Sequence, residues 1–231
     1  MPDYIFKEEG ERLVLVGRFN ELYQSVEDPW GQSSTAGGMQ HFYRYSRQIL
    51  QDIVCAQSAF YDRSLNILEV GCGHGYFLFQ LRKVVTDARL IGLDISPEAI
   101  TKAKSLANEG ELNIEFYSGD VANNEILRSL ETKFDILLVN QCFWYLLDKF
   151  KAVLDNLEKI TTPSGLIVIS QAFPRNQRYG NEIANGYPGA FEFIKTLCSS
   201  CTNLYIKESR YKDDHSLPHI DCHFILQKTS D

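Results

Sequence analysis

Short apolar runs alternate with amphipathic stretches along the chain from residue 66 onward. The apolar runs predict buried strands, and the amphipathic stretches predict helices. Such an alternation is typical of βαβ units, so we expect an α/β fold with a doubly wound, mostly parallel sheet. The predicted strands cover residues 66–70, 89–94, 113–117, 135–140, 166–170, 204–209 and 220–227, and the predicted helices cover residues 76–85, 97–108, 149–160 and 190–198.

The first sixty residues differ from the rest of the chain. Residues 19–30 and 42–53 have helical spacing and are joined by the glycine-rich stretch GQSSTAGG. Because they precede the sheet, we expect residues 1–60 to form an N-terminal helical cap and residues 61–231 to form the α/β part of the same domain. Residues 174–188 predict a long loop, and loops of this length in compact domains are usually functional.

Length, charge and cysteine content narrow the class of protein. A chain of 231 residues suits one α/β domain, and no apolar run approaches the roughly 20 residues of a membrane-spanning helix. The start of the chain lacks the features of a signal peptide, so we expect a cytoplasmic protein with no membrane contact. A net charge of −7 without a run of Lys and Arg argues against nucleic acid as a partner. Six cysteines then indicate reduced thiols, and the single CxxC at Cys198 and Cys201 is weak support for zinc.

A glycine-rich turn between a predicted strand and a predicted helix is the strongest chemical signal. Glu69 precedes the run GCGHG at 71–75, where glycines let the backbone turn sharply and approach a ligand closely. A dinucleotide site requires GxGxxG and holds a pyrophosphate at the start of the helix. The chain has GxGxG after an acid instead, and a carboxylate beside a pyrophosphate would repel it.

Acids at the ends of predicted strands favour a ligand without phosphate. Glu69 suits an ammonium group, and Asp94 is placed to accept two hydrogen bonds from ribose hydroxyls. Asp120 can accept from the exocyclic amine of an adenine, while Val121 N–H meets a ring nitrogen and Ile95 covers the ring. Together these groups predict S-adenosylmethionine, which offers an ammonium, a sulfonium, a ribose and an adenine. A nicotinamide-dependent oxidoreductase shares the turn and the ribose acid and is the alternative.

Four segments, in order, resemble the successive motifs of the class I S-adenosylmethionine-dependent methyltransferases: ILEVGCGHGYF, LIGLDIS, SGDV and FDILLVNQCFWYLLD. The resemblance covers residues 66–173 and implies a seven-stranded Rossmann-like sheet of order 3-2-1-4-5-7-6 with its last strand antiparallel. The N-terminal stretch DPWGQSSTAGGMQHFYRYSRQIL is similar to the lead-in of nodulation-type N-methyltransferases, where it forms a cap over the cofactor. The resemblance places the following residues on cofactor positions: Glu69, Gly71, Gly73, Asp94, Ile95, Asp120, Val121 and Asn140.

The resemblance implies a methyltransferase acting on a small-molecule acceptor. We expect this acceptor to be a sugar or another polar metabolite, methylated on oxygen or nitrogen. A non-catalytic S-adenosylmethionine-binding module is a further alternative, because a cofactor pocket alone does not prove turnover. The sequence does not decide between a monomer and a homodimer.

Aromatic residues after the fourth strand are the candidates for contact with the acceptor. We expect Trp144 and Tyr145 to wall the acceptor pocket with ring faces that suit a cation, and core packing is an equal alternative for each. The family often carries a histidine near the position of Tyr145, and its absence here leaves no general base identified.

Two further groups of polar residues carry weaker expectations. A lid helix would bring residues 41–45 over the cofactor, and Tyr45 is the candidate for contact among His41, Tyr43, Arg44 and Tyr45. In the last strand, His219, Asp221 and His223 share one face because side chains alternate along a strand. They suit a metal or a base, but a polar outer face explains them equally well, so we predict no metal.

Overall fold

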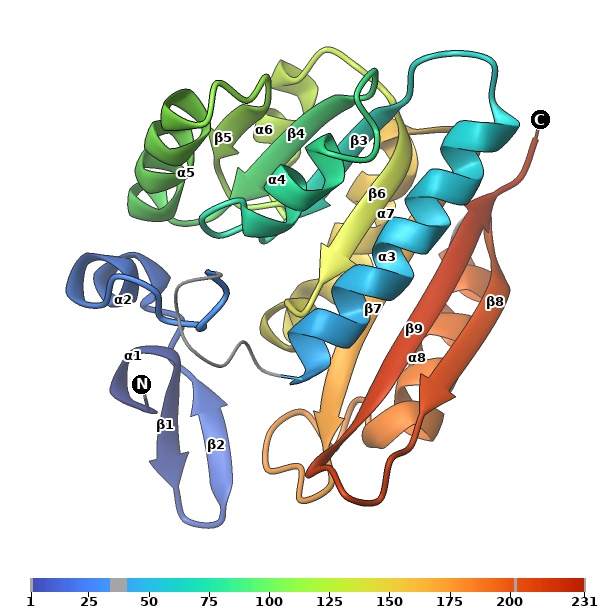
Figure 1. Cartoon of the computed structure of the whole chain (residues 1–231). Helices are drawn as coiled ribbons and strands as arrows, with labels where there is room; N and C mark the ends of the chain where they lie inside the picture. Colours follow the sequence, from blue (N-terminus) through green and yellow to red (C-terminus); the bar gives the residue numbers. More distant parts are fainter. Residues whose placement is uncertain (1, 34–40, 202, 231) are drawn as a thin grey trace.

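The computed structural model describes residues 2–33, 41–201 and 203–230, and a seven-stranded sheet lies at its centre (Figure 1). The strand order is β5-β4-β3-β6-β7-β9-β8, and β9 runs antiparallel to both neighbours. Numbered within this sheet, the order is 3-2-1-4-5-7-6, as the resemblance predicted. The strands are β3 (Asn66–Val70), β4 (Arg89–Asp94), β5 (Glu115–Ser118), β6 (Phe134–Asn140), β7 (Thr161–Pro174), β8 (Leu204–Lys212) and β9 (His219–Lys228).

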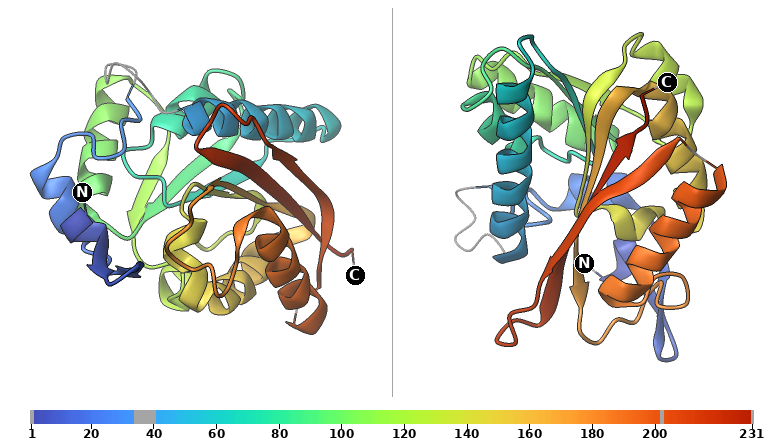
Figure 2. Two further views of the ribbon diagram at one scale, coloured as in Figure 1. Left: turned by 90° about the horizontal axis from the view of Figure 1, so that it is seen from below. Right: turned by 90° about the vertical axis from the view of Figure 1, so that its right-hand side faces the viewer.

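Helices cover both faces of the sheet and bury a separate core on each. Side chains alternate along β6, so Ile136 and Leu138 enter one core while Leu137 and Val139 enter the other. The right-hand view of Figure 2 shows α3 and α8 on opposite sides of the sheet. No helix in the described ranges has the length and apolar character needed to cross a membrane. One face holds α3 (His41–Phe60), α4 (Tyr76–Arg82) and α5 (Pro97–Glu109), and the other holds α6 (Asn124–Ser129), the 3₁₀ helix η1 (Phe143–Lys149), α7 (Phe150–Ile160) and α8 (Gly186–Cys201).

The N-terminal residues form a hairpin as well as helices. Between α1 (Pro2–Ile5) and α2 (Phe19–Ser25), the strands β1 (Phe6–Glu9) and β2 (Arg12–Leu15) pair in antiparallel fashion. This hairpin was not predicted from the sequence. Most of the glycine-rich stretch after α2, residues 34–40, lies outside the described residues.

The long helix α3 covers the sheet, whereas we expected a lid over the cofactor. It packs on β6, β7 and β9, and its Leu50 and Val54 are fully buried in the core of that face. The segment that lies over the carboxyl edge of the sheet is instead the hairpin with α2 (Figure 1). We call residues 2–33 the N-terminal cap from here on.

Contacts with the segment after β7 hold the hairpin in place. The backbone N–H of Leu13 donates to the carbonyl of Arg178 at 3.0 Å, and the Arg178 side chain donates to the carbonyl of Glu11 and to the Glu8 carboxylate, each at 3.1 Å. The ring of Phe6 lies 4.9 Å from that of Tyr179. The loop predicted at 174–188 is shorter than expected, because α8 begins at residue 186. Through the contacts above, this loop supports the cap.

Candidate active site

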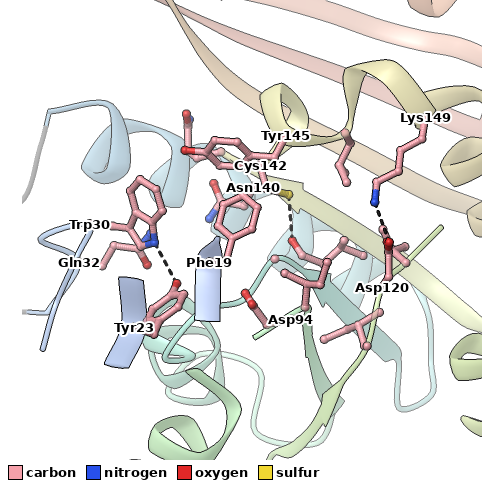
Figure 3. Close-up of a pocket in the computed structure, with 18 of the residues that line it drawn as sticks. Phe19, Tyr23, Trp30, Gln32, Asp94, Asp120, Asn140, Cys142, Tyr145 and Lys149 are labelled. Carbon is pink, nitrogen blue, oxygen red and sulfur yellow. Dashed lines mark hydrogen bonds and ion pairs between the residues drawn. The ribbon is translucent and has the colours of Figure 1, made fainter. Parts of the chain in front are cut away.

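A cavity of about 780 Å³, open to solvent, lies between the carboxyl ends of the strands and the N-terminal cap (Figure 3). Its place at the carboxyl ends of the strands is where open α/β sheets bind ligands. The residues that line it are Phe19, Tyr23, Trp30, Gln32, Tyr43, Val70, Gly71, Leu93, Asp94, Ile95, Gly119, Asp120, Val121, Asn140, Gln141, Cys142, Tyr145, Leu146 and Lys149.

The glycine turn after β3 requires glycine for two reasons. Gly71, Gly73 and Gly75 have φ values of 69°, 53° and 80°, a left-handed backbone that side chains disfavour. A Cβ on Gly71 would lie 2.8 Å from the sulfur of Cys142, and a Cβ on Gly73 would lie 2.7 Å from the Tyr23 hydroxyl. Gly71 lines the cavity, whereas Gly73 is covered by the cap and is absent from the lining.

Asp94 is buried at the end of β4 and is held by the backbone. Its Oδ2 accepts from the N–H of Gly73 at 2.8 Å, and its Oδ1 accepts from the N–H of Ser96 at 2.9 Å. Burial raises the pKa of this carboxyl, and the backbone hydrogen bonds oppose that effect. A carboxylate has about four acceptor sites, so Asp94 keeps part of its acceptor capacity for a ligand in the cavity that it lines.

Glu69 lies behind Asn140 and has one unsatisfied oxygen. Its Oε1 accepts from Nδ2 of Asn140 at 3.3 Å, whereas its Oε2 is buried and meets no hydrogen-bond donor in the part of the chain that the structure describes. Burial raises the pKa of Glu69 to about 8, although the Asn140 bond and the charge of Arg47 act in the opposite direction. Asn140 lines the cavity, and Glu69 does not.

Arg47 is a buried cation close to Glu69, outside the lining of the cavity. It comes from α3, is 4% exposed, and donates to the carbonyl and to Oε1 of Gln32, both at 3.3 Å. Neither Arg47 nor Gln32 was predicted from the sequence as a site residue. The spacing of α3 carries a signal for Arg47, because Tyr43, Arg47 and Leu50 recur on one face of the helix.

The far side of the cavity is lined by the carboxylate of Asp120 and by the apolar side chains of Val121 and Ile95. The Oδ2 of Asp120 pairs with Nζ of Lys149 at 2.7 Å, and its Oδ1 accepts from the N–H of Ala122 at 2.9 Å (Figure 3). Val121 is buried, while Ile95 is 46% exposed and faces the cavity. A large apolar side chain that is exposed beside a cavity is suited to covering a ligand ring. Lys149 was not anticipated from the sequence.

An aromatic wall closes the cavity on the side of the cap. Tyr145 lies with its ring centroid 5.0 Å from that of Phe19 and 5.9 Å from that of Trp30. Burial raises the pKa of the Tyr145 hydroxyl, which therefore stays protonated at neutral pH. Trp144 lies elsewhere: its indole N–H donates to the carbonyl of Ala172 at 3.1 Å, so it packs beside β7 and does not line the cavity.

Tyr45 also lies outside the cavity. Its ring centroid is 5.5 Å from that of His223, and Nζ of Lys212 lies 4.6 Å from the Tyr45 ring centroid. Tyr43, two residues earlier in α3, lines the cavity instead, because residues two apart in a helix point to different sides. Arg44 is exposed, and the side chain of His41 falls outside the described part of the chain.

The histidines of β9 lie under α3. Asp221 and His223 are buried, and burial lowers the pKa of His223 to about 4. Among the described residues, no three His, Cys, Asp or Glu side chains are arranged to hold a metal ion. Cys198 is buried, and the side chain of Cys201 lies outside the described residues.

Comparisons with known proteins identify the family. The family model described as a methyltransferase domain matches residues 61–217. The chain is 32% identical over 109 residues to malonyl-[acyl-carrier protein] O-methyltransferase of Bacillus anthracis, which covers 47% of this chain and 38% of that protein. It is also 32% identical over 154 residues to the enzyme of the same description from Bacillus cereus, covering 67% of this chain and 52% of that protein. The chain thus spans about half or less of the length of these curated relatives.

Solved structures agree in fold. The N-methyltransferase NodS from Bradyrhizobium japonicum WM9 superposes with a TM-score of 0.61 at 20% identity, covering 82% of this chain and 97% of that one. Magnesium protoporphyrin IX methyltransferase (ChlM) from Synechocystis PCC 6803, solved with bound S-adenosylmethionine, gives a TM-score of 0.65 at 17% identity, covering 91% and 93%. The family match spans more than half of the chain and sets aside the oxidoreductase alternative. The chain belongs to the class I S-adenosylmethionine-dependent methyltransferases.

Proposed function

We propose that this protein binds S-adenosylmethionine in the cavity at the carboxyl edge and transfers its methyl group to a small acceptor. The observation that carries the proposal is the pair of buried carboxylates, Glu69 and Asp94, on either side of the glycine turn. In the ligand-free protein the raised pKa keeps Glu69 largely protonated, and an ammonium group beside it would favour its ionised form. Asp94 would repel a pyrophosphate and suits ribose hydroxyls, so the pair fits a ligand with an ammonium group and a ribose but no phosphate.

The groups around the cavity fit each part of this cofactor. Glu69 and Arg47 lie just outside the lining: the unsatisfied Oε2 of Glu69 suits the ammonium group through a bridging water, and the buried cation of Arg47 nearby suits the carboxylate. The free acceptor sites of Asp94 suit the ribose hydroxyls. Ile95 offers an apolar surface to the adenine, and Asp120 keeps acceptor capacity for the exocyclic amine beside its pair with Lys149.

The protein would contribute orientation and the exclusion of water. The bound cofactor supplies an activated methyl group on a sulfonium, so little acid–base chemistry is compulsory. The rings of Phe19, Trp30 and Tyr145 form a wall that keeps water from the reacting end and presents ring faces favourable to a cation. Holding two reactants in line reaches effective molarities of roughly 10⁵ to 10⁸ M.

The lining supports an acceptor that the protein need not deprotonate. The described lining residues include no histidine, and burial raises the pKa of Tyr43 to about 12 and that of Tyr145 further still. Neither phenol takes a proton from an acceptor at neutral pH. We therefore favour an amine or an already ionised oxygen of a small polar metabolite over a neutral sugar hydroxyl. The relatives named above include both an O- and an N-methyltransferase.

A transfer assay with methyl-labelled S-adenosylmethionine tests this proposal. We expect label to pass to an amine or a carboxylate in a panel that also holds sugars and phenols, and to fall strongly with the Asp94→Asn variant. Cofactor binding without product across the panel would favour the non-catalytic binding module. Absence of cofactor binding by folded protein would refute the proposal altogether.

A further inference from the structure

Tyr23 stands where the N-terminal cap meets the glycine turn. Its ring lies 4.9 Å from that of His74, and its hydroxyl lies 2.7 Å from the place where a Cβ on Gly73 would be. It comes from α2, far in sequence from the turn, and lines the cavity beside Asp94 (Figure 3). The small size of Gly73 therefore admits the Tyr23 hydroxyl to the cavity wall.

The hydroxyl of Tyr23 has a proton that no described residue accepts. A phenol donates one hydrogen bond and accepts others, whereas an indole N–H only donates. The indole N–H of Trp30 donates to the Tyr23 oxygen at 2.9 Å, so this contact uses an acceptor site and leaves the O–H available. Burial raises the pKa of Tyr23 well above its ordinary value, which keeps the hydroxyl protonated.

The charge of Asp94 decides which ligand group suits this donor. Asp94 is the charged residue with the largest effect on the pKa of Tyr23, and it offers acceptor sites to the same cavity. A ligand carboxylate only accepts, and Asp94 would repel it. A ligand hydroxyl can donate to Asp94 and accept from Tyr23 at the same time.

We propose that Tyr23 is a further cofactor-recognition residue, whose hydroxyl donates a hydrogen bond to a ribose hydroxyl that itself donates to Asp94. This inference rests on the proposed function, because it takes the adenosyl group to bind beside Asp94. It also gives the cap a role in affinity: Trp30 holds the Tyr23 oxygen and belongs to the aromatic wall at the same time. Cofactor binding and the position of the acceptor wall are then linked through one hydrogen bond.

Calorimetry with the Tyr23→Phe variant tests the inference. We expect this variant to bind S-adenosylhomocysteine and 5′-methylthioadenosine, which lacks the amino acid group, about 3- to 10-fold more weakly than the wild type. The 2′-deoxy or the 3′-deoxy form of methylthioadenosine, whichever lacks the hydroxyl that Tyr23 contacts, should bind equally to both proteins. The matched control is Tyr4→Phe, which removes a cap hydroxyl paired with Ser25 at 3.1 Å and should change none of these affinities.

Three outcomes would overturn the inference. They are unchanged affinities in the Tyr23→Phe variant, a loss confined to S-adenosylhomocysteine, and an equal loss for all four ligands. The second would place Tyr23 at the amino acid end, and the third would indicate a general effect on the cap. If folded wild-type protein binds none of the ligands, the proposed function fails instead, so the two failures are distinguishable.

Discussion

Replacing Glu69 with Gln should stabilise the ligand-free protein while weakening cofactor binding. The unfolded chain ionises this carboxyl near its ordinary pKa of 4.5, whereas burial raises the pKa to about 8 in the folded protein. Folding therefore takes up a proton between these two values. The contribution of Glu69 to the free energy of unfolding is therefore greatest below about pH 4.5, and it falls as the pH rises toward 8. Gln keeps an oxygen that can accept from Asn140 but has no proton to exchange.

The size of the effect follows from the raised pKa. One pKa unit corresponds to about 1.36 kcal/mol, and pH 7 lies about 2.5 units above the ordinary value. The wild-type protein should lose about 3 kcal/mol between pH 4 and pH 7 through this group, and the variant should not. For a domain of this length, 3 kcal/mol corresponds to roughly 6 to 12 °C in Tm.

The assay is the difference in unfolding free energy between the two proteins, measured with urea at pH values from 4 to 8. Other titrating groups are shared and largely cancel in this difference, as does any fixed cost of burying the Gln amide. We expect the variant to gain about 3 kcal/mol relative to wild type on going from pH 4 to pH 7, and to bind S-adenosylhomocysteine more weakly. A difference that stays constant with pH would refute the raised pKa and the reasoning built on it.

Two further predictions concern the crowding around Gly71 and the ion pair between Arg63 and Asp135. Gly71→Ala should cost about 2 to 4 kcal/mol in urea unfolding, because the new Cβ meets Cys142. The control is Gly31→Ala, which has φ 59° and no atom nearby and should cost only about 1 to 2 kcal/mol. Equal costs for the two variants would contradict the crowding at Gly71. Arg63→Met should cost about 1 kcal/mol at pH 7, since the half-exposed Arg63 lowers the pKa of buried Asp135. That cost should shrink as the pH falls below 3.8, the ordinary pKa of Asp, because the unfolded chain then takes up a proton before folded Asp135 does. A deficit independent of pH would contradict this.

Much of the sheet could be predicted from the sequence because burial imposes a period on each element. The runs at 66–70 and 89–94 match their strands residue for residue, since parallel strands buried on both faces are continuously apolar. The strand order came from the resemblance and is confirmed. The β1–β2 hairpin was missed because its four-residue strands carry mixed charge, and its support comes from Arg178, more than 160 residues away.

The part of the site that the sheet supplies was predicted more fully than the part that the cap supplies. Asp94, Asp120 and Asn140 stand at strand ends, and parallel strands bring such positions to one edge. Tyr23 and Trp30 enter the cavity through tertiary contacts that no local pattern encodes. The spacing in α3 could have shown which of its residues point inward, because Tyr43 lies on the side of the helix that buries Leu50 and Val54, whereas Tyr45 does not.

We propose that the cavity at the carboxyl edge binds an adenosyl ligand without phosphate through Asp94. Calorimetric titration of S-adenosylhomocysteine into the wild type and the Asp94→Asn variant measures this binding. We expect one site of micromolar affinity in the wild type and a loss of roughly 10-fold or more in the variant, because a charge-assisted acceptor is removed. Equal affinity in both proteins, or no heat with this ligand and binding of NADH instead, would contradict it.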